Sequence, residues 1–185
     1  METLTHLSLT ELEAGLDDIR QSPDDYGILK MIVRRPNVDE REMVNEGELH
    51  LENGLVGDTW RMRGSKHTED GSANIQAQIT LMNARTVALL AQDEKRWALA
   101  GDQLFVDFNL SEDNLPPGTL IAVGSAILEV SAVPHTGCAK FSQRFGVEAH
   151  KFVNSPEGKR LRLRGINTRI IQAGTIHVGD VVKKV

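Results

Sequence analysis

The feature that most constrains the fold is a series of short apolar runs separated by glycine-containing turns. Residues 28–33 form a continuous, β-branched run, and residues 75–81 alternate apolar and polar side chains, as a strand with one buried face does. Gly124-Ser125 separates two further runs at residues 119–123 and 126–133, and glycine at the first position of a two-residue loop favours a hairpin turn. These runs predict a strand-rich fold.

Further runs typical of strands lie at residues 48–51, 103–110, 160–164, 166–172 and 178–182. Because several runs are short and are joined by glycine turns, we predict a mainly β (α+β) fold, a partly closed β-barrel with a few short peripheral helices.

The amino-terminal segment predicts a short amphipathic helix. Ser8 and Glu11 have the spacing of a capping box, and leucine and isoleucine then recur at helical spacing to about Gln21. We therefore expect an N-terminal helical extension at residues 1–27 and one barrel domain at residues 28–185. A chain of 185 residues is long enough for one domain with a substantial core.

Other helices are predicted between the strands. Asn83 can cap a helix that runs through residues 85–91 and on to Trp97, before Gly101-Asp102 ends it. Residues 141–145 suit one or two helical turns, and residues 147–153 another short helix. We expect the segment that follows, residues 155–158, to form a turn.

Composition excludes several classes of protein. A formal charge of −5, from 21 basic and 26 acidic side chains, disfavours a general nucleic-acid binder, whose affinity comes mainly from phosphate neutralisation. One cysteine permits neither an internal disulfide nor a multi-cysteine metal site, which indicates a reducing compartment. The amino terminus lacks the order of a signal peptide, and no apolar run is long enough to span a membrane. We therefore expect a cytoplasmic protein with no membrane partner.

Common nucleotide and metalloprotease signatures are missing. The chain contains no Gly-x-Gly-x-x-Gly, no phosphate-binding Gly-x-x-x-x-Gly-Lys-Ser/Thr and no His-Glu-x-x-His. Nothing in it resembles the cysteine signature of a protease. Four histidines are predicted to be structural or surface residues, namely His50, His67, His150 and His177.

The only cysteine, Cys138, is placed on a turn between the predicted hairpin and a short helix. His135, Lys140 and Arg144 are close in sequence, and a following helix would direct backbone N–H groups toward a thiolate. A thiolate is a nucleophile and a soft metal ligand. The alternative is that Cys138 is a small packing residue, as many free cysteines are.

Two groups of basic residues could bind an anion. The first comprises Arg61, Arg63 and Lys66, in the irregular segment 59–73, which can equally be a solvated surface loop. The second comprises Arg160, Arg162 and Arg164, which alternate with leucines and would share one face of a strand. That strand is either an edge protected by charge or part of an anion site.

Several short motifs follow one another in a distinctive order. They are Pro134-His135-Thr136-Gly137-Cys138-Ala139-Lys140-Phe141, Arg144-Phe145-Gly146, Arg164-Gly165-Ile166 and Gly179-Asp180-Val181-Val182, with Gly57-Asp58 upstream. Their order resembles the core of the MOSC family, the molybdenum cofactor sulfurase C-terminal domain, in its small stand-alone bacterial form. The resemblance covers most of the chain beyond about Ile28. One departure is that many relatives have Pro-Arg-x-Pro-Cys, so that His135 stands where they have arginine.

The resemblance implies a MOSC-type barrel that binds the molybdenum cofactor (molybdopterin), without pyridoxal phosphate. It implies that Cys138 ligates the metal or carries sulfur, with Lys140 in the same catalytic motif. The residues expected to hold the cofactor are Cys138, His135, Arg61, Arg63, Lys66, Arg162 and Arg164.

For some relatives the resemblance suggests reduction of small N-hydroxylated substrates. The expected partners are therefore a small-molecule substrate or a sulfur donor, and a redox partner protein. The alternative function is a non-catalytic β-barrel binding module in which Cys138 only packs.

Overall fold

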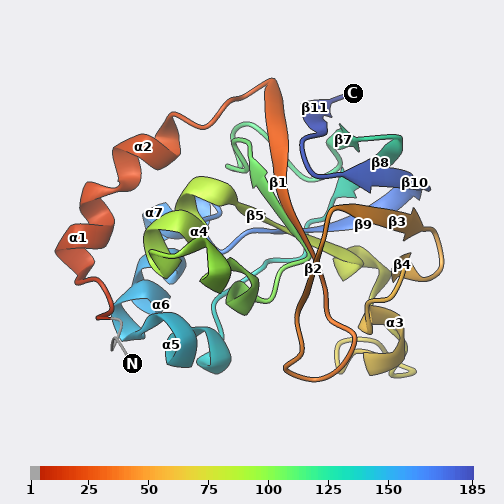
Figure 1. The fold of residues 1–185 in the computed structure, drawn as a ribbon, viewed down its shortest axis with the longest axis horizontal. Helices are drawn as coiled ribbons and strands as arrows, with labels where there is room; N and C mark the ends of the chain where they lie inside the picture. Colours follow the sequence, from red (N-terminus) through yellow and green to blue (C-terminus); the bar gives the residue numbers. More distant parts are fainter. Residues whose placement is uncertain (1–4) are drawn as a thin grey trace.

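A computed structural model describes residues 5–185 (Figure 1). Seven strands form a closed barrel in the order β1-β6-β5-β9-β8-β7-β11, and β11 pairs again with β1. All neighbouring pairs are antiparallel except β5 and β6, which are parallel. The barrel strands are β1 (Tyr26–Arg34), β5 (Ile79–Asn83), β6 (Leu104–Asp107), β7 (Leu120–Val123), β8 (Ala126–Val130), β9 (Ile166–Gln172) and β11 (Val181–Lys184). The predicted barrel with short peripheral helices is confirmed.

The other strands lie beside the barrel. β2 (Glu42–Val44) extends the sheet by pairing with β1. A three-stranded sheet contains β10 (Gly174–His177), β3 (Glu46–His50) and β4 (Gly54–Leu55) in that order.

Most helices gather on one side of the barrel, whereas α3 lies away from them beside β4 (Figure 1). Helical and strand contents are about equal. The helices are α1 (Leu9–Ala14), α2 (Leu16–Arg20), α3 (Trp60–Arg63), α4 (Ala84–Ala91), α5 (Ala139–Phe145), α6 (Val147–Asn154) and α7 (Pro156–Arg160), with 3₁₀ segments η1 (Ile75–Ala77) and η2 (Glu94–Ala100). No helix within residues 5–185 is long and apolar enough to cross a membrane.

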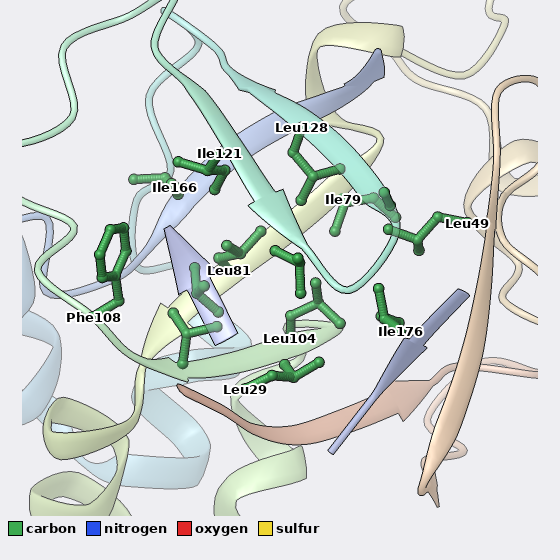
Figure 2. Packing of buried hydrophobic residues seen from close by; sticks show 14 of the residues in the cluster. Leu29, Leu49, Ile79, Leu81, Leu104, Phe108, Ile121, Leu128, Ile166 and Ile176 are labelled. Atoms are coloured by element: carbon green, nitrogen blue, oxygen red, sulfur yellow. The ribbon is translucent and has the colours of Figure 1, made fainter. Parts of the chain in front are cut away.

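Two hydrophobic cores share the wall of the barrel. The first fills the barrel interior, where Leu29, Ile79 and Leu104 point toward one another (Figure 2). The second lies between the wall and the helices and includes Phe105 and Phe152. Strand β6 contributes to both cores because its successive side chains point to opposite faces, and its first three residues, Leu104, Phe105 and Val106, are therefore all apolar.

The local sequence signals at the amino-terminal helix and at α4 are confirmed. The capping box of Ser8 and Glu11 begins α1, and the side chain of Asn83 accepts from the backbone N–H groups of Arg85 and Thr86 to begin α4. Gly101, with a positive φ of 91°, ends η2.

Several predicted segments were wrong. The helix predicted to continue to Trp97 ends at Ala91, where Gln92 takes a left-handed conformation, and residues 94–100 form the separate 3₁₀ segment η2. The strand predicted at residues 75–81 begins only at Ile79, because the side chain of Asn74 caps a 3₁₀ turn before it. The turn predicted at residues 155–158 is the start of α7, where Ser155 caps the helix and Pro156 occupies its first position. Residues 160–164 are the end of α7 and a turn rather than a strand, so the three arginines do not share a face.

The long segment 59–73 contains one helical turn, α3, and otherwise lacks regular structure. Near the carboxyl terminus, β10 ends before a turn at Gly179-Asp180, and β11 then closes the barrel.

Candidate functional site

Cys138 is exposed at the start of α5, where it occupies the N-cap position. The turn before it is held by Asn154, whose Oδ1 accepts from the backbone N–H of Gly137 at 3.0 Å. The packing role considered for Cys138 is therefore wrong. Its Sγ is accessible to a ligand or a reactant.

A buried carboxylate lies on the barrel side of this turn. Asp102 has no exposed surface, and its two oxygens accept from Arg164 Nη1 at 2.5 Å and contact His135 Nε2 at 2.8 Å. Burial alone would raise the pKa of Asp102, but Arg164 and His135 together lower it to about 2. Asp102 is therefore ionised, and we call Asp102, His135 and Arg164 the buried triad.

The environment of His135 fixes its protonation. Burial lowers the pKa of His135, and repulsion by Arg164 lowers it further, against the attraction of Asp102. A neutral imidazole that contacts an ionised carboxylate through Nε2 carries its proton there, so the lone pair lies on Nδ1. Within residues 5–185, Nδ1 has no hydrogen-bond partner and can accept a proton or a hydrogen bond.

Both Nη atoms of Arg164 are hydrogen-bonded, whereas its buried Nε has no acceptor within residues 5–185. Its Nη2 donates to the carbonyl of Ala100 at 2.9 Å, and its guanidinium lies 4.9 Å from the ring centre of Phe141 in α5. Arg164 thus connects Ala100, at the end of η2, to the helix that follows Cys138.

A second buried ion pair lies next to the triad. Arg35, at the end of β1, donates through Nε and Nη2 to the two oxygens of Asp58, both at 2.8 Å. Its Nη1 donates to the carbonyl of Gly101 at 3.1 Å, directly before Asp102 in the chain. Burial opposes ionisation of Asp58, but the hydrogen bonds and charge of Arg35 lower the pKa of Asp58.

Further cations surround this pair. The Nη atoms of Arg41 and Arg144 lie 3.9 and 4.0 Å from the position that a Cβ on Gly101 would occupy. Burial and the charges of Arg144 and Arg35 lower the pKa of Arg41. Burial and the charge of Arg35 lower the pKa of Arg63. We define the cationic cluster as Arg35, Arg41, Arg63, Lys140 and Arg144.

The carboxylates near the cluster do not neutralise it. Asp58 is committed to Arg35, and the exposed Asp39 is shared by Lys140 and Arg144, each at 3.2 Å. Arg41 has no carboxylate within 4.0 Å in the described part of the chain, and its Nε is buried there with no acceptor. A buried donor without an acceptor is costly, and a bound anion would satisfy it.

A cavity of about 520 Å³ is bordered by two members of the triad. Its lining includes His135 from the cysteine motif and Arg162 and Arg164 from the second basic group. No set of three or more His, Cys, Asp or Glu side chains that could hold a metal ion occurs within residues 5–185.

The predicted basic residues and His135 thus lie in the cavity, in the cationic cluster or in neither. His135, Arg162 and Arg164 line the cavity, whereas Arg63 and Lys140 belong to the cationic cluster. The structure does not bring Arg61 and Lys66 to either place. Arg61 donates to Asn53 at the surface, and Lys66 is an exposed residue of the 59–73 loop.

Sequence analysis missed Asp102, Arg35 and Arg41. The sequence pattern indicated only a helix end at Gly101-Asp102, and it did not single out Arg35 or Arg41. A signal was available at Asp102, since a carboxylate directly before the buried strand β6 must be paired with a cation.

Comparison with known proteins assigns the family. The MOSC domain profile matches residues 68–183, and the chain therefore belongs to the MOSC domain family. No curated protein matches the chain.

Solved structures share the fold. The YUAD protein from Bacillus subtilis aligns with a TM-score of 0.64 and 13% identity, over 86% of this chain and 95% of that one. YiiM from Escherichia coli aligns with a TM-score of 0.55 and 17% identity, over 85% of this chain and 69% of that one. YiiM from Geobacillus stearothermophilus aligns with a TM-score of 0.52 and 15% identity, over 86% of this chain and 73% of that one.

Proposed function

We propose that this protein binds the molybdenum cofactor, with its phosphate on the cationic cluster and Cys138 as a thiolate ligand of the metal. The observation that carries the proposal is the excess of positive charge at the cluster, which includes the buried and unpartnered Nε of Arg41. Lys140 and Arg144 lie on α5, the helix that begins at Cys138, so the thiol and the cations share one element.

The residues present fit the chemistry of this cofactor. A phosphorylated group suits arginines that lack a carboxylate, and a soft metal suits a thiolate. Since the described residues offer no cluster of protein ligands for a metal, the metal has to arrive already held by another group. A pterin dithiolene does this, and Cys138 then adds one protein ligand.

When bound, the cofactor supplies a redox-active metal that can exchange an oxygen atom, and the protein positions it. The exposed Cys138 fixes the metal side, and the cationic cluster orients the phosphate side. His135 lines the cavity, and its Nδ1 can take up a proton from solvent and deliver it to a departing oxygen. This arrangement supports reduction of a small N-hydroxylated substrate, with electrons from a redox partner protein.

Cofactor retention tests the proposal. The full chain is purified from a host that makes the cofactor, and molybdenum and phosphorylated pterin are measured per mole of protein. We expect Arg41→Gln and Arg63→Gln to lower both contents, because each removes a cation from the cluster. Arg61→Gln is the matched control, since Arg61 bonds Asn53 outside the cluster. Equal contents in all four proteins would contradict the proposed phosphate site.

Sulfur transfer is a second candidate function, favoured by the exposure of Cys138. A persulfide carrier needs a thiol that a donor protein can reach. After incubation with a cysteine desulfurase and cysteine, mass spectrometry should show a gain of one sulfur that a reductant removes. Its absence on wild type, or its equal presence on Cys138→Ser, would eliminate this function.

A further inference from the structure

The cavity that His135 and Arg164 border contains an arginine with no salt-bridge partner among residues 5–185. Arg162 is half-buried and lines the cavity, yet no carboxylate in the described part of the chain lies within 4.0 Å of it. Burial lowers the pKa of Arg162, opposed only by the more distant charge of Glu112. Two exposed residues of opposite charge, Lys159 and Glu112, also line the cavity.

The local backbone holds Arg162 in this position. Its φ is +51°, a conformation that arginine rarely adopts, and its Nη1 donates to the carbonyl of Leu115 at 2.6 Å. A weaker contact joins Nη1 to the carbonyl of Leu110 at 3.4 Å. These bonds use one edge of the guanidinium. The other edge, Nε and Nη2, donates to no residue within 5–185.

That free edge is suited to a carboxylate. Arg35 uses the same two atoms, Nε and Nη2, to bind both oxygens of Asp58 at 2.8 Å. A guanidinium binds a carboxylate in this two-bonded form with both strength and fixed orientation. Arg162 can therefore bind a carboxylate in the cavity through Nε and Nη2, as Arg35 binds Asp58.

The other lining residues indicate that the part of the ligand beyond its carboxylate is apolar. Much of the wall is apolar, and it includes Val133, Pro134, Val153 and Ile166. Asn167 lies at the same wall, but its amide nitrogen already donates to the carbonyls of Val133 and Pro134. A cavity of about 520 Å³ is within the range of small-molecule sites.

We propose that this cavity binds a small organic carboxylate with an apolar body, anchored by Arg162. The apolar body packs on the wall, in a cavity that His135 also lines. That this carboxylate is the substrate rests on the proposed cofactor function, whereas the binding site itself does not.

Calorimetric titration of the full chain with phenylacetate and phenylacetamide tests the site. The two probes have the same apolar body and differ in charge. We expect phenylacetate to bind at least about tenfold more tightly, because a hydrogen-bonded charge pair contributes that much or more. Arg162→Gln should lose this preference, while Arg160→Gln should keep it. Arg160 is the matched control because it pairs with Asp113 and Glu157 outside the cavity.

A second variant separates charge from folding. Val133→Asp places a carboxylate on the apolar wall without removing the bonds of Arg162, and it should also abolish phenylacetate binding. Equal binding of the two probes, no binding of phenylacetate to wild type, or phenylacetate binding unchanged in Arg162→Gln or Val133→Asp would each overturn the proposal. Molybdenum content measured on the same samples distinguishes this failure from a failure of the cofactor function.

Discussion

Arg164 Nη1 donates to Asp102 Oδ2 at 2.5 Å, and both side chains are buried. This bond joins the turn before β9 to the segment before β6, which are far apart in the sequence. Asp102 also contacts His135, so one buried carboxylate holds two side chains that line the cavity. Gly101, the residue before it, accepts from Arg35 of the cationic cluster.

Asp102→Asn should lower the free energy of unfolding by about 3–5 kcal/mol, because it leaves the buried Arg164 without a counter-charge. Urea denaturation at neutral pH measures the change. Asp107→Asn is the control, because the Asp107–Arg85 pair is partly exposed and contributes about 1 kcal/mol or less. Equal losses in the two variants would contradict the role given to Asp102.

The stability of the protein should fall as the pH is lowered from about 7 toward 5. Burial and Arg164 lower the pKa of His135 in the folded state, so the unfolded chain binds a proton first, near pH 6.5. For this one proton the slope cannot exceed about 1.4 kcal/mol per pH unit. Urea denaturation at several pH values should show a shallower fall for His135→Gln. An unchanged slope would show that His135 is not held neutral.

A further loss is expected in stronger acid. The pKa of Asp102 is lowered to about 2, below its usual value of about 3.9, so its stabilising contribution is complete above pH 4. It should disappear as the pH falls from about 4 to 2, when the carboxylate is protonated. Circular dichroism along an acid titration should place a steeper transition in this window for wild type than for Asp102→Asn.

Gly165 should tolerate no side chain. Its φ is +112°, and a Cβ there would lie 2.3 Å from the carbonyl oxygen of Leu81 and 3.2 Å from the ring of His135. Gly165→Ala should therefore cost roughly 2 kcal/mol more than Gly118→Ala. Gly118 also has a positive φ, of +90°, but has nothing within 4 Å. Equal Tm losses would mean that the contact with Leu81 relaxes freely.

The regular parts of this fold could be predicted from local signals. Strand β1 follows from a continuous apolar run, and α1 and α4 follow from the caps at Ser8 and Asn83, because both signals act within a few residues. The strand predicted at Arg160 to Arg164 failed because alternation alone does not exclude a helix end followed by a turn at Arg162.

The site was less predictable than the fold. Cys138, His135 and Arg164 were identified from motif order, but the partner that joins two of them, Asp102, lies more than thirty residues earlier. The same holds for Arg35, whose partner Asp58 comes 23 residues later. Contacts between distant residues depend on barrel closure, which a single sequence does not specify.

We propose that Cys138 ligates a cofactor-borne metal beside the cationic cluster. The most direct test is the molybdenum content of the full chain from a cofactor-producing host, for wild type and Cys138→Ser, with X-ray absorption at the molybdenum edge. We expect about one metal per wild-type chain, and a loss of metal, or of one sulfur ligand per metal, in Cys138→Ser. Negligible metal in both proteins, or identical metal content and sulfur coordination in both, would contradict the account.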